Sequence, residues 1–293
     1  MRSLLFVPGD DERKIAKGLA SAADALILDL EDSVAPQRKS VAREFCARTI
    51  ASADARHKLF VRINALDTAD ALFDLAAVVG ARPFGIVLPK CRGGDDVRLV
   101  GHYLTALEAR ESVAAGAIRV LPIVTESGAA MFGLGSYGSY DSPPLPRLCG
   151  MLWGGEDLAA DVGAIANRDG EGRYTAPYQL ARSLCLFAAT AASVIGVDAV
   201  YTNFRDTAGL QEEALEGLRS GFSAKAAIHP DQIETINAAF TPSAADTEWA
   251  HGVIAAFDAS PGAGVASVSG RMLDRPHYRS AQRVLARARQ LKT

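Results

Sequence analysis

The 293-residue sequence has little cysteine, no long apolar run and no excess of either charge. Its four cysteines, Cys46, Cys91, Cys149 and Cys185, are widely spaced and form no Cys-x-x-Cys pair. This pattern excludes a disulfide framework and favours reduced, mostly buried thiols in a cytoplasmic protein. No apolar stretch approaches the length of a membrane span, and the apolar residues after Met1 are too few for a secretory signal.

The absence of a strong net charge limits the partners that we expect. The chain has 31 Lys and Arg against 34 Asp and Glu, a net charge of −3 and a pI near 6.0. Such a balance does not indicate nucleic acid, and we expect neither nucleic acid nor a membrane as partner. The hydrophobic share of 49% leaves ample material for a core. The length suits one large α/β barrel or two ordinary domains.

What the sequence does have is a series of short apolar runs that end in residues suited to chemistry. These ends are Pro8-Gly9, Asp29, Arg62, Lys90, Glu126, Glu156-Asp157, Asn203 and His229. Nearly continuous apolar runs are typical of parallel strands covered on both faces. Segments with helical periodicity separate them, so that strand-then-helix units recur about eight times. The pattern predicts an α/β fold, a (β/α)8 TIM barrel over residues 1–240. An open doubly wound sheet is the alternative, but it gives the polar ends no reason to converge.

The last part of the chain, residues 241–293, has a different pattern. A helix is expected over 242–257, with Ser243 as its N-cap, followed by a flexible Gly-, Ala- and Ser-rich connection over 259–270. A final amphipathic helix has an apolar stripe made of Ala281, Val284, Leu285, Ala288 and Leu291. We therefore predict a C-terminal helical extension. It has too little apolar material to fold alone, so it should pack on its own barrel or on a neighbouring subunit.

Two acidic residues are candidate metal ligands. Glu126 and Asp157 each close an apolar run, so their carboxylates should point into the mouth of the barrel. Two carboxylates with several waters make an oxygen-rich site, which suits Mg²⁺. The alternative is that each carboxylate accepts hydrogen bonds from loop backbone. Glu156 is the rival ligand, although adjacent residues at a strand end point in opposite directions.

Basic residues at other strand ends have candidate roles as well. Arg62 can bind a small carboxylate through two parallel hydrogen bonds, or it can pair with the acidic cluster at 29–32. That cluster would orient Arg62 and metal-bound waters. Lys90 could form a Schiff base, as in some aldolases. His229 is more typical of a packed, hydrogen-bonded histidine than of a ligand.

The first strand end has a different kind of pattern. Gly9 allows close approach of backbone, and Asp10 or Asp11 can cap the helix that follows. The start of that helix, together with Arg13, could then meet a phosphorylated ligand. A solvated helix face is the simpler interpretation of its charges.

Together, these strings resemble the HpcH/HpaI aldolase and citrate lyase β-subunit superfamily. They look most like its CitE-like branch, which contains malyl-CoA and citramalyl-CoA lyases. The matching strings are LFVPG at 5–9, LDLEDSV at 28–34, VRIN at 61–64, VLPK at 87–90, TES at 125–127, GEDLAAD at 155–161, GF at 221–222, Lys225, IHPDQI at 228–233 and MLD at 272–274. They span essentially the whole chain.

The resemblance implies a TIM barrel, assembled as a homotrimer or hexamer, that makes or breaks a carbon–carbon bond beside a carbonyl group with Mg²⁺. By motif, Glu126 and Asp157 would ligate the metal. Glu126 would also contact substrate. Arg62 would bind the 2-oxo acid (glyoxylate, pyruvate or oxaloacetate) and take part in catalysis.

Three further positions take their expected roles from the resemblance. Phe6 and Arg13 fall where relatives contact the acyl-CoA. Asp274 matches a tail aspartate that, in relatives, reaches a neighbouring subunit's active site. There it acts as an acid or base or promotes thioester hydrolysis, so Asp274 is the second expected catalytic residue.

The expected reaction is Mg²⁺-dependent cleavage or formation of a β-hydroxyacyl-CoA thioester, such as malyl-CoA or citramalyl-CoA, with a 2-oxo acid and acetyl-CoA as the other side. One alternative is a citryl lyase β subunit that acts on an acyl carrier protein. Another is a barrel that binds an acyl-CoA or keto acid without turnover. Aldol cleavage of a hydroxy-keto acid that is not a thioester also stays open.

Overall fold

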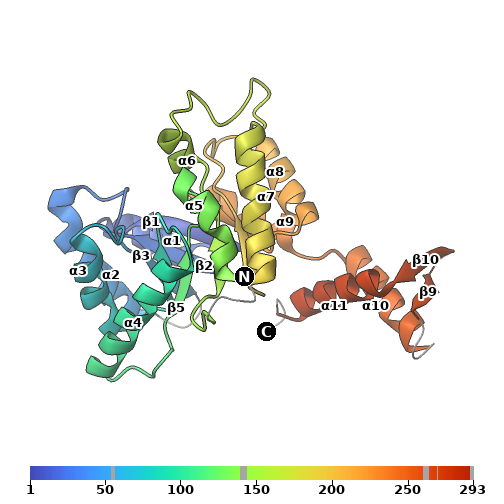
Figure 1. Ribbon diagram of the computed structural model, residues 1–293, viewed down its shortest axis with the longest axis horizontal. Coiled ribbons are helices and arrows are strands. Elements are labelled where there is room, and N and C mark those ends of the chain that lie inside the picture. Colours follow the sequence, from blue (N-terminus) through green and yellow to red (C-terminus); the bar gives the residue numbers. More distant parts are fainter. Residues whose placement is uncertain (54–56, 139–143, 260–263, 269, 291–293) are drawn as a thin grey trace. The chain divides into compact units, whose positions relative to one another are not determined.

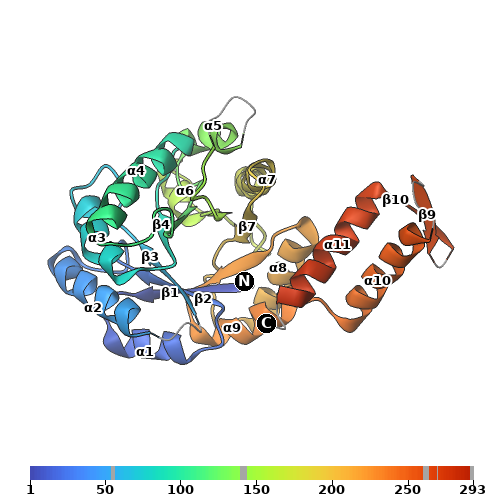
Figure 2. The same cartoon turned by 90° about the horizontal axis from the view of Figure 1, so that it is seen from below.

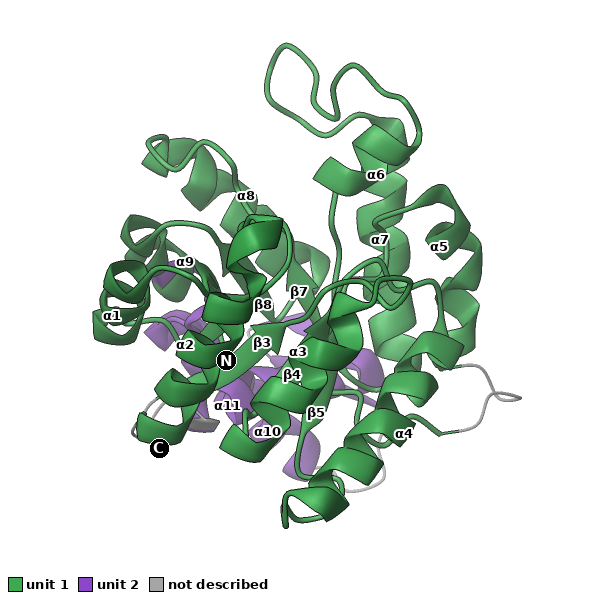
Figure 3. Cartoon of the chain, turned by 90° about the vertical axis from the view of Figure 1, so that its left-hand side faces the viewer, with its two compact units in different colours: residues 1–237 green, residues 238–293 purple. Residues whose placement is uncertain are grey.

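The computed structural model describes residues 1–53, 57–138, 144–259, 264–268 and 270–290. The chain divides into two compact units, residues 1–237 and 238–293 (Figure 3). The first unit is a βα barrel, and the second consists of helices and a β-hairpin.

The first unit is built on eight parallel strands in the order β5-β4-β3-β2-β1-β8-β7-β6. Isolated parallel bridges, Val120 to Leu148 and Ile123 to Leu152, join the two ends of that order, so the barrel is nearly closed. This confirms the predicted (β/α)8 barrel. The strands are β1 (Ser3–Pro8), β2 (Ala25–Asp29), β3 (Lys58–Arg62), β4 (Gly85–Leu88), β5 (Arg119–Pro122), β6 (Gly150–Leu152), β7 (Ile195–Asp198) and β8 (Ala224–Ala227).

Helices of the first unit lie outside the strands (Figures 1 and 2). They are α1 (Glu12–Ala20), α2 (Lys39–Ser52), α3 (Asp70–Val78), α4 (Gly94–Arg110), α5 (Gly128–Gly133), α6 (Glu156–Asp161), α7 (Ala176–Ala191), α8 (Thr207–Ser220) and α9 (Ile233–Phe240), the last of which runs into the second unit. Short 3₁₀ helices cover Pro36–Arg38, Val79–Ala81, Leu134–Tyr137 and Pro230–Gln232. Among the described residues, no helix combines the length and apolar character needed to cross a membrane.

Apolar side chains from the strands form one buried cluster, as continuous apolar runs require. It includes Leu4, Ile27, Phe60, Val87, Leu121, Leu152, Val197 and Ala226. Gly85 shows how tight this packing is, because an added Cβ would lie 2.8 Å from the ring of Phe60. Interiors at this density hold the strands, and therefore their polar ends, in fixed positions.

The second unit contains α10 (Ala244–Asp258), β9 (Val265–Val268), β10 (Arg271–Asp274) and α11 (Arg275–Gln290). Ser243 caps α10 as predicted, in a reciprocal capping box with Asp246. The expectation of a flexible connection over 259–270 is wrong for the described stretch 265–268, which pairs antiparallel with β10. The reason is that this stretch has β-branched Val at both ends, and Gly270, at a φ of +76°, reverses the chain before β10.

Helices α10 and α11 share a small core with the hairpin. Its buried members are Ala250, Val253, Phe257, Leu273, Ala281 and Leu285. The predicted apolar stripe of the last helix therefore contributes Ala281 and Leu285 to this core, while its Leu291 lies outside the described residues.

Candidate active site

A cavity of about 350 Å³ lies at the carboxyl ends of the barrel strands, and we call it the mouth cavity. It brings together four of the predicted site residues, which are Phe6, Arg62, Glu126 and Asp157. Its other walls include Asp29, Ile123, Leu152, Trp153, Tyr174, Val200 and Ile228. A small cavity with apolar walls and a few convergent charged groups is the usual form of a site for a small ligand.

Arg62 is held rigidly at the edge of this cavity by Asp29, its direct neighbour across strands β2 and β3. Its Nε and Nη2 atoms donate to the two carboxylate oxygens of Asp29 at 2.6 and 2.7 Å. Burial raises the pKa of Asp29, but the hydrogen bonds and charge of Arg62 outweigh it, and the pKa is lowered. Because Asp29 occupies the Nε edge, the far edge of the guanidinium keeps one N–H on each Nη for a second carboxylate. Both roles that the sequence left open for Arg62 are therefore compatible.

Glu31 lies between two cations. Its Oε2 is 3.0 Å from Nη1 of Arg62 and its Oε1 is 2.6 Å from Nζ of Lys90. The contact to Arg62 is a charge contact only, because Oε2 is buried without a hydrogen bond. Burial raises the pKa of Glu31 in spite of these cations. For Lys90, burial lowers the pKa but the bond to Glu31 raises it further, so the ammonium stays protonated. A protonated, ion-paired amine is a poor nucleophile, which argues against a Schiff base at Lys90.

Glu126 and Asp157 face each other in the mouth cavity. The side chain of Glu126 is only 6% exposed, and its Oε2 accepts a hydrogen bond from the backbone N–H of Lys90 at 2.5 Å. Burial, and then a side-chain hydrogen bond with Asp157, raise the pKa of Glu126 well above its ordinary value. Two carboxylates that share a partly dry site repel one another unless a proton or a cation lies between them.

This donor set fits a hard divalent cation. Nowhere in the described residues do three or more His, Cys, Asp and Glu side chains gather in a way that could hold a metal. Two carboxylates therefore leave most coordination positions to water and to ligand oxygens. Mg²⁺ is bound in this way in many enzymes, through one or two carboxylates plus substrate and water.

The expectation that both acids stand directly at strand ends is wrong. Glu126 lies in a bend four residues after the end of β5, and Asp157 is further still from a strand. Strand β6 ends at Leu152, and Asp157 lies in the first turn of α6. An acidic residue is favourable there because the helix N-terminus carries a partial positive charge. The rival ligand Glu156 is exposed, and its Oε1 accepts a hydrogen bond from Asn167 at 2.8 Å.

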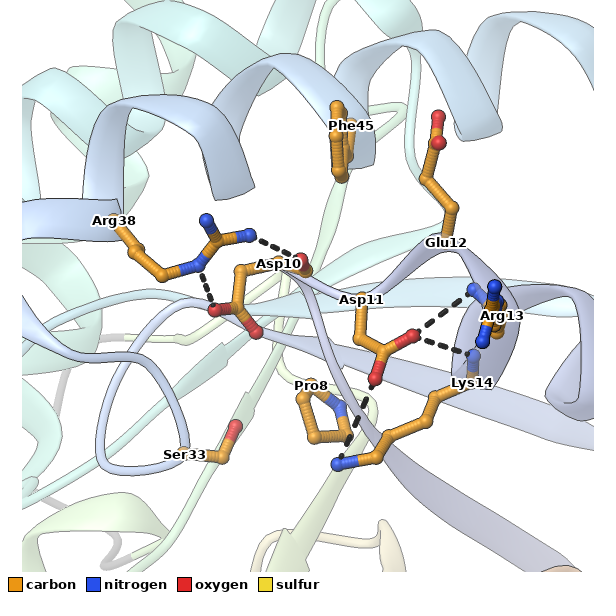
Figure 4. Close-up of a pocket in the computed structure, with 9 residues that line it drawn as sticks. All are labelled: Pro8, Asp10, Asp11, Glu12, Arg13, Lys14, Ser33, Arg38 and Phe45. Atoms are coloured by element: carbon orange, nitrogen blue, oxygen red, sulfur yellow. Dashed lines mark hydrogen bonds and ion pairs between the residues drawn. The ribbon is translucent and has the colours of Figure 1, made fainter.

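A second cavity, of about 550 Å³, surrounds the start of α1, and we call it the outer cavity (Figure 4). Asp11 caps α1 by accepting the backbone N–H groups of Arg13 and Lys14 at 3.0 and 3.1 Å. Two of the N–H groups at the helix start are therefore already satisfied. Positive charge reaches this cavity from the side chains of Arg13, Lys14 and Arg38, the last of which pairs with Asp10 at 2.6 Å.

Two remaining predicted residues lie elsewhere. Asp274 ends β10 in the second unit, with its side chain 54% exposed and 2.6 Å from Nδ1 of His277. The hydrogen bond from His277 lowers the pKa of Asp274. His229 caps the 3₁₀ helix that starts at Pro230 and stacks on Phe204 at 4.7 Å, so the interpretation as a packed histidine is correct.

The aromatic wall of the mouth cavity was not predicted from the sequence. Trp153 and Tyr174 pack edge to face, with ring centroids 4.9 Å apart. Trp153 directly precedes the Gly154-Gly155-Glu156-Asp157 string, and that position was the available signal. Tyr174 comes from a loop after α6, and nothing local in the sequence places its ring against Trp153.

The chain is similar to known proteins over nearly its whole length. A family model described as HpcH/HpaI aldolase/citrate lyase matches residues 2–230, and one described as a C–C bond lyase of the TIM-barrel fold matches residues 178–291. The chain is 36% identical over 290 residues to a (3S)-malyl-CoA thioesterase of Cereibacter sphaeroides, covering 98% of this chain and 94% of that protein. It is 32% identical over 299 residues to the mitochondrial citramalyl-CoA lyase of Mus musculus, covering 99% and 87%.

A solved structure is similar over the same length. The protein CitE from Mycobacterium tuberculosis, in complex with magnesium, acetoacetate and coenzyme A, matches with a TM-score of 0.78 at 33% identity, covering 98% of this chain and 97% of that one. Both the family resemblance and the assignment as a carbon–carbon lyase are thereby confirmed. The chain belongs to the HpcH/HpaI aldolase/citrate lyase family.

Proposed function

We propose that this protein is a Mg²⁺-dependent lyase that cleaves or forms a β-hydroxyacyl-CoA thioester, such as malyl-CoA or citramalyl-CoA, with a 2-oxo acid and acetyl-CoA as the other side of the reaction. The observation that carries the proposal is the pair Glu126 and Asp157, which share the mouth cavity with Arg62. The names of the thioesterase and lyase relatives support a CoA thioester. The magnesium in the CitE structure supports the cofactor.

Glu126 and Asp157 would hold the Mg²⁺ ion. When bound, the cation supplies Lewis-acid stabilisation of the negative charge that develops on oxygen as the carbon–carbon bond breaks. For the protein, the cation also offsets the repulsion between the two carboxylates. The backbone N–H of Lys90 fixes one oxygen of Glu126 and so orients the other.

Arg62 binds the carboxylate of the 2-oxo acid through the Nη1 and Nη2 edge that Asp29 does not occupy, beside the Glu31 carboxylate. Asp29 holds the guanidinium in place through two bonds, so little side-chain entropy is lost on binding. The ring of Phe6 lies 5.0 Å from the guanidinium and covers one of its faces. A fixed cation at this position would stabilise charge in the transition state without rearrangement.

Cleavage also requires a group that takes the hydroxyl proton and a group that protonates the new enolate carbon. We assign acid–base work to Asp274 of a neighbouring subunit, which is the role that the resemblance implies. Its lowered pKa keeps it ionised, as a base must be. Such a group contributes about 10²–10⁴-fold to the rate. The same residue is the candidate for thioester hydrolysis after cleavage, the activity named for the Cereibacter relative.

The outer cavity is the proposed position of the nucleotide part of the acyl-CoA. It shares Pro8 and Ser33 with the mouth cavity, so one extended ligand could occupy both. Arg13, Lys14 and Arg38 supply side-chain donors for its phosphate groups. Phe6 stands where the acyl end would enter the mouth cavity.

The test is a panel of substrates for the purified chain. Malyl-CoA, citramalyl-CoA and citryl-CoA are incubated separately with and without Mg²⁺, and products are identified by mass. We expect a 2-oxo acid and acetyl-CoA from at least one substrate, with loss of activity in excess chelator. Full activity in excess chelator contradicts the proposal. Inactivity on every CoA ester, with activity on a citryl carrier protein, would favour the citryl lyase alternative.

Assembly and location stay predictions. A homotrimer or hexamer is expected because Asp274 acts in a neighbouring subunit under this proposal. Light scattering on the purified protein measures the mass of the assembly. The cytoplasm is the expected location because of the cysteine usage. Tight acyl-CoA binding without product over hours would instead support the alternative of a binding protein.

A further inference from the structure

A buried cluster of charges borders the mouth cavity, and the chemistry proposed above does not use it. Its centre is Asp198, the last residue of β7, which is fully buried. Arg182 donates to both its oxygens at 3.0 Å, and Nζ of Lys225 lies 3.3 Å from Oδ2. Lys225, with no exposed surface, also donates to Glu213 at 2.8 Å. We call these four residues the Asp198 cluster.

Such a cluster contributes little net free energy to the stability of a fold. Removing several charges from water costs free energy that their mutual attraction only partly returns, and apolar side chains of similar volume often stabilise as well or better. The best-attested use of buried charge is to fix one geometry. The contacts of the cluster indicate which geometry that is.

Trp153 connects the cluster to the metal-binding segment. Its Nε1–H donates to Oδ1 of Asp198 at 2.7 Å, and its ring is completely buried. An added Cβ on Gly155 would lie 3.1 Å from that ring, so the indole packs directly against the backbone two residues before Asp157. An added Cβ on Gly154 would lie 3.1 Å from Cγ of Glu126. The backbone of these two glycines, between β6 and α6, therefore fits between Trp153 and the other proposed ligand.

A second connection runs through Tyr174, which also packs on Trp153. The guanidinium of Arg168 lies 3.7 Å above the ring of Tyr174. Arg168 is also ion-paired with Glu213, a member of the Asp198 cluster, at 2.7 Å. The cluster thus reaches segment 154–157 by two routes, through Trp153 and through the loop that carries Tyr174.

We propose that Asp198 and Trp153 are positioning residues for Asp157. The cluster fixes the indole, and the indole fixes the backbone of 154–157, so that the carboxylate of Asp157 faces Glu126 at the separation that a divalent cation needs. This inference rests on the proposed function as far as the cation is concerned. It adds Asp198, which does not line the mouth cavity, and gives Trp153, which does, a role in positioning Asp157.

The test compares three variants of the full-length protein. Each is titrated with Mn²⁺ in the absence of substrate, and electron paramagnetic resonance measures the bound ion. Mn²⁺ is used because it takes the same oxygen ligands as Mg²⁺. Trp153→Phe keeps the aromatic ring and removes the N–H donor, and we expect its Kd for Mn²⁺ to rise at least fivefold. Asp198→Asn should raise it more.

Glu108→Gln is the matched control. The substitution weakens the buried ion pair between Glu108 and Arg147 in the same barrel. Neither residue of this pair lines the mouth cavity. The unfolding temperature of this variant should fall at least as far as that of Trp153→Phe, while its Kd for Mn²⁺ stays within twofold of wild type. A purely structural role for the Asp198 cluster would make the three variants alike.

Hydrogen exchange of the metal-free proteins gives a second measurement that does not depend on metal. The peptide that covers residues 153–161 should exchange about fivefold faster in Trp153→Phe than in wild type. Its exchange rate in Glu108→Gln should equal that of wild type. If Asp198→Asn does not fold, Trp153→Phe decides the question.

The outcomes separate this inference from the proposed function. Wild-type protein that binds no Mn²⁺ overturns the proposed metal site and this inference with it. Wild-type binding together with unchanged Mn²⁺ affinity and unchanged exchange in Trp153→Phe overturns this inference alone. Weakened binding and faster exchange confined to the Trp153 and Asp198 variants support it.

Discussion

Glu108 and Glu126 are both buried glutamates of the same barrel, but their charges are compensated in opposite ways. Burial raises the pKa of Glu108, but hydrogen bonds from Arg147 and from two backbone N–H groups outweigh it, and the pKa falls to about 2. Glu126 has one backbone donor and a facing carboxylate, Asp157, and its pKa is raised. An acid whose charge the protein neutralises is part of the framework. A buried acid that instead faces a second carboxylate is suited to bind a cation from solution.

The Asp198 cluster extends the comparison. Burial raises the pKa of Asp198, but the charges of Lys225 and Arg182 outweigh it, and the pKa is lowered. The barrel thus contains a buried carboxylate whose charge is compensated by Lys and Arg side chains. Among the described residues, the side chains of Arg62 and Lys90 act on Glu126 and Asp157 only through longer-range charge interactions, without an ion pair. This weaker compensation is therefore a property of that site and not of the fold.

The largest effect is expected at Glu126, the glutamate of this comparison that faces a second carboxylate. Glu126→Gln keeps the bond from the Lys90 N–H but removes one metal-binding charge, so kcat/KM should fall about 10³-fold, or about 4 kcal/mol of transition-state stabilisation. Without metal the variant should unfold at a higher temperature than wild type, because repulsion with Asp157 is gone. Steady-state kinetics and thermal melts measure both. Glu156→Gln is the control and should stay within about threefold of wild type.

Arg62→Lys tests the cation opposite the two acids. Lysine cannot bond both oxygens of Asp29 and present a second edge to substrate, so kcat/KM should fall about 10²-fold, mainly through KM for the 2-oxo acid. The measurement is the condensation reaction at varied 2-oxo acid concentration. Arg48→Lys, at a surface ion pair with Glu12, should leave KM unchanged. An unchanged KM in Arg62→Lys would remove Arg62 from substrate binding.

Glu108→Gln tests the compensated end. Weakening this buried pair leaves Arg147 without its counter-charge, which should lower the free energy of unfolding by about 3 kcal/mol. Kinetic constants should stay within twofold of wild type, because Glu108 lies outside the mouth cavity. Urea unfolding and steady-state assays measure the two quantities. A large loss of activity at full stability would contradict the assignment of Glu108 to the framework.

The smallest effect is the pH dependence of that stability difference. Glu108 has a folded pKa of about 2 against an ordinary value of 4.5, so it binds its proton less readily when folded. Its contribution, roughly 3 kcal/mol, is fully present above pH 4.5 and is lost as the pH falls toward 2. Wild type and Glu108→Gln should therefore converge in stability over that range in urea titrations. A difference that stays constant down to pH 2 contradicts the lowered pKa.

Much of the site could be predicted because it follows directly from the strands. Arg62 ends β3, so its place in the mouth needed only the strand boundary and the rule that parallel strands end at one face. Asp157 was selected correctly for the mouth cavity but on the wrong element, because the run through Trp153 looks like a strand although β6 stops at Leu152. Helix α6 begins only four residues later, and periodicity cannot resolve so short a junction.

The Asp198 cluster and the aromatic wall could not be predicted in the same way. Trp153 and Asp198 are 45 residues apart in the chain, and each by itself looks like an ordinary strand-end residue. The stretch 265–268 shows the same limit in the second unit, since a Gly- and Ser-rich composition hides a strand that forms only with its partner β10.

The sequence by itself determined the barrel, its family and the residues that gather at its mouth. It could do so because burial on both faces forces continuous apolar strands, and the polar residues that end them then converge on one side. Only the tertiary structure decided which charges compensate each other, so that Glu108 is framework and Glu126 is open to a cation. That decision depends on distances of about 3 Å between residues far apart in the chain, and no local pattern records such distances.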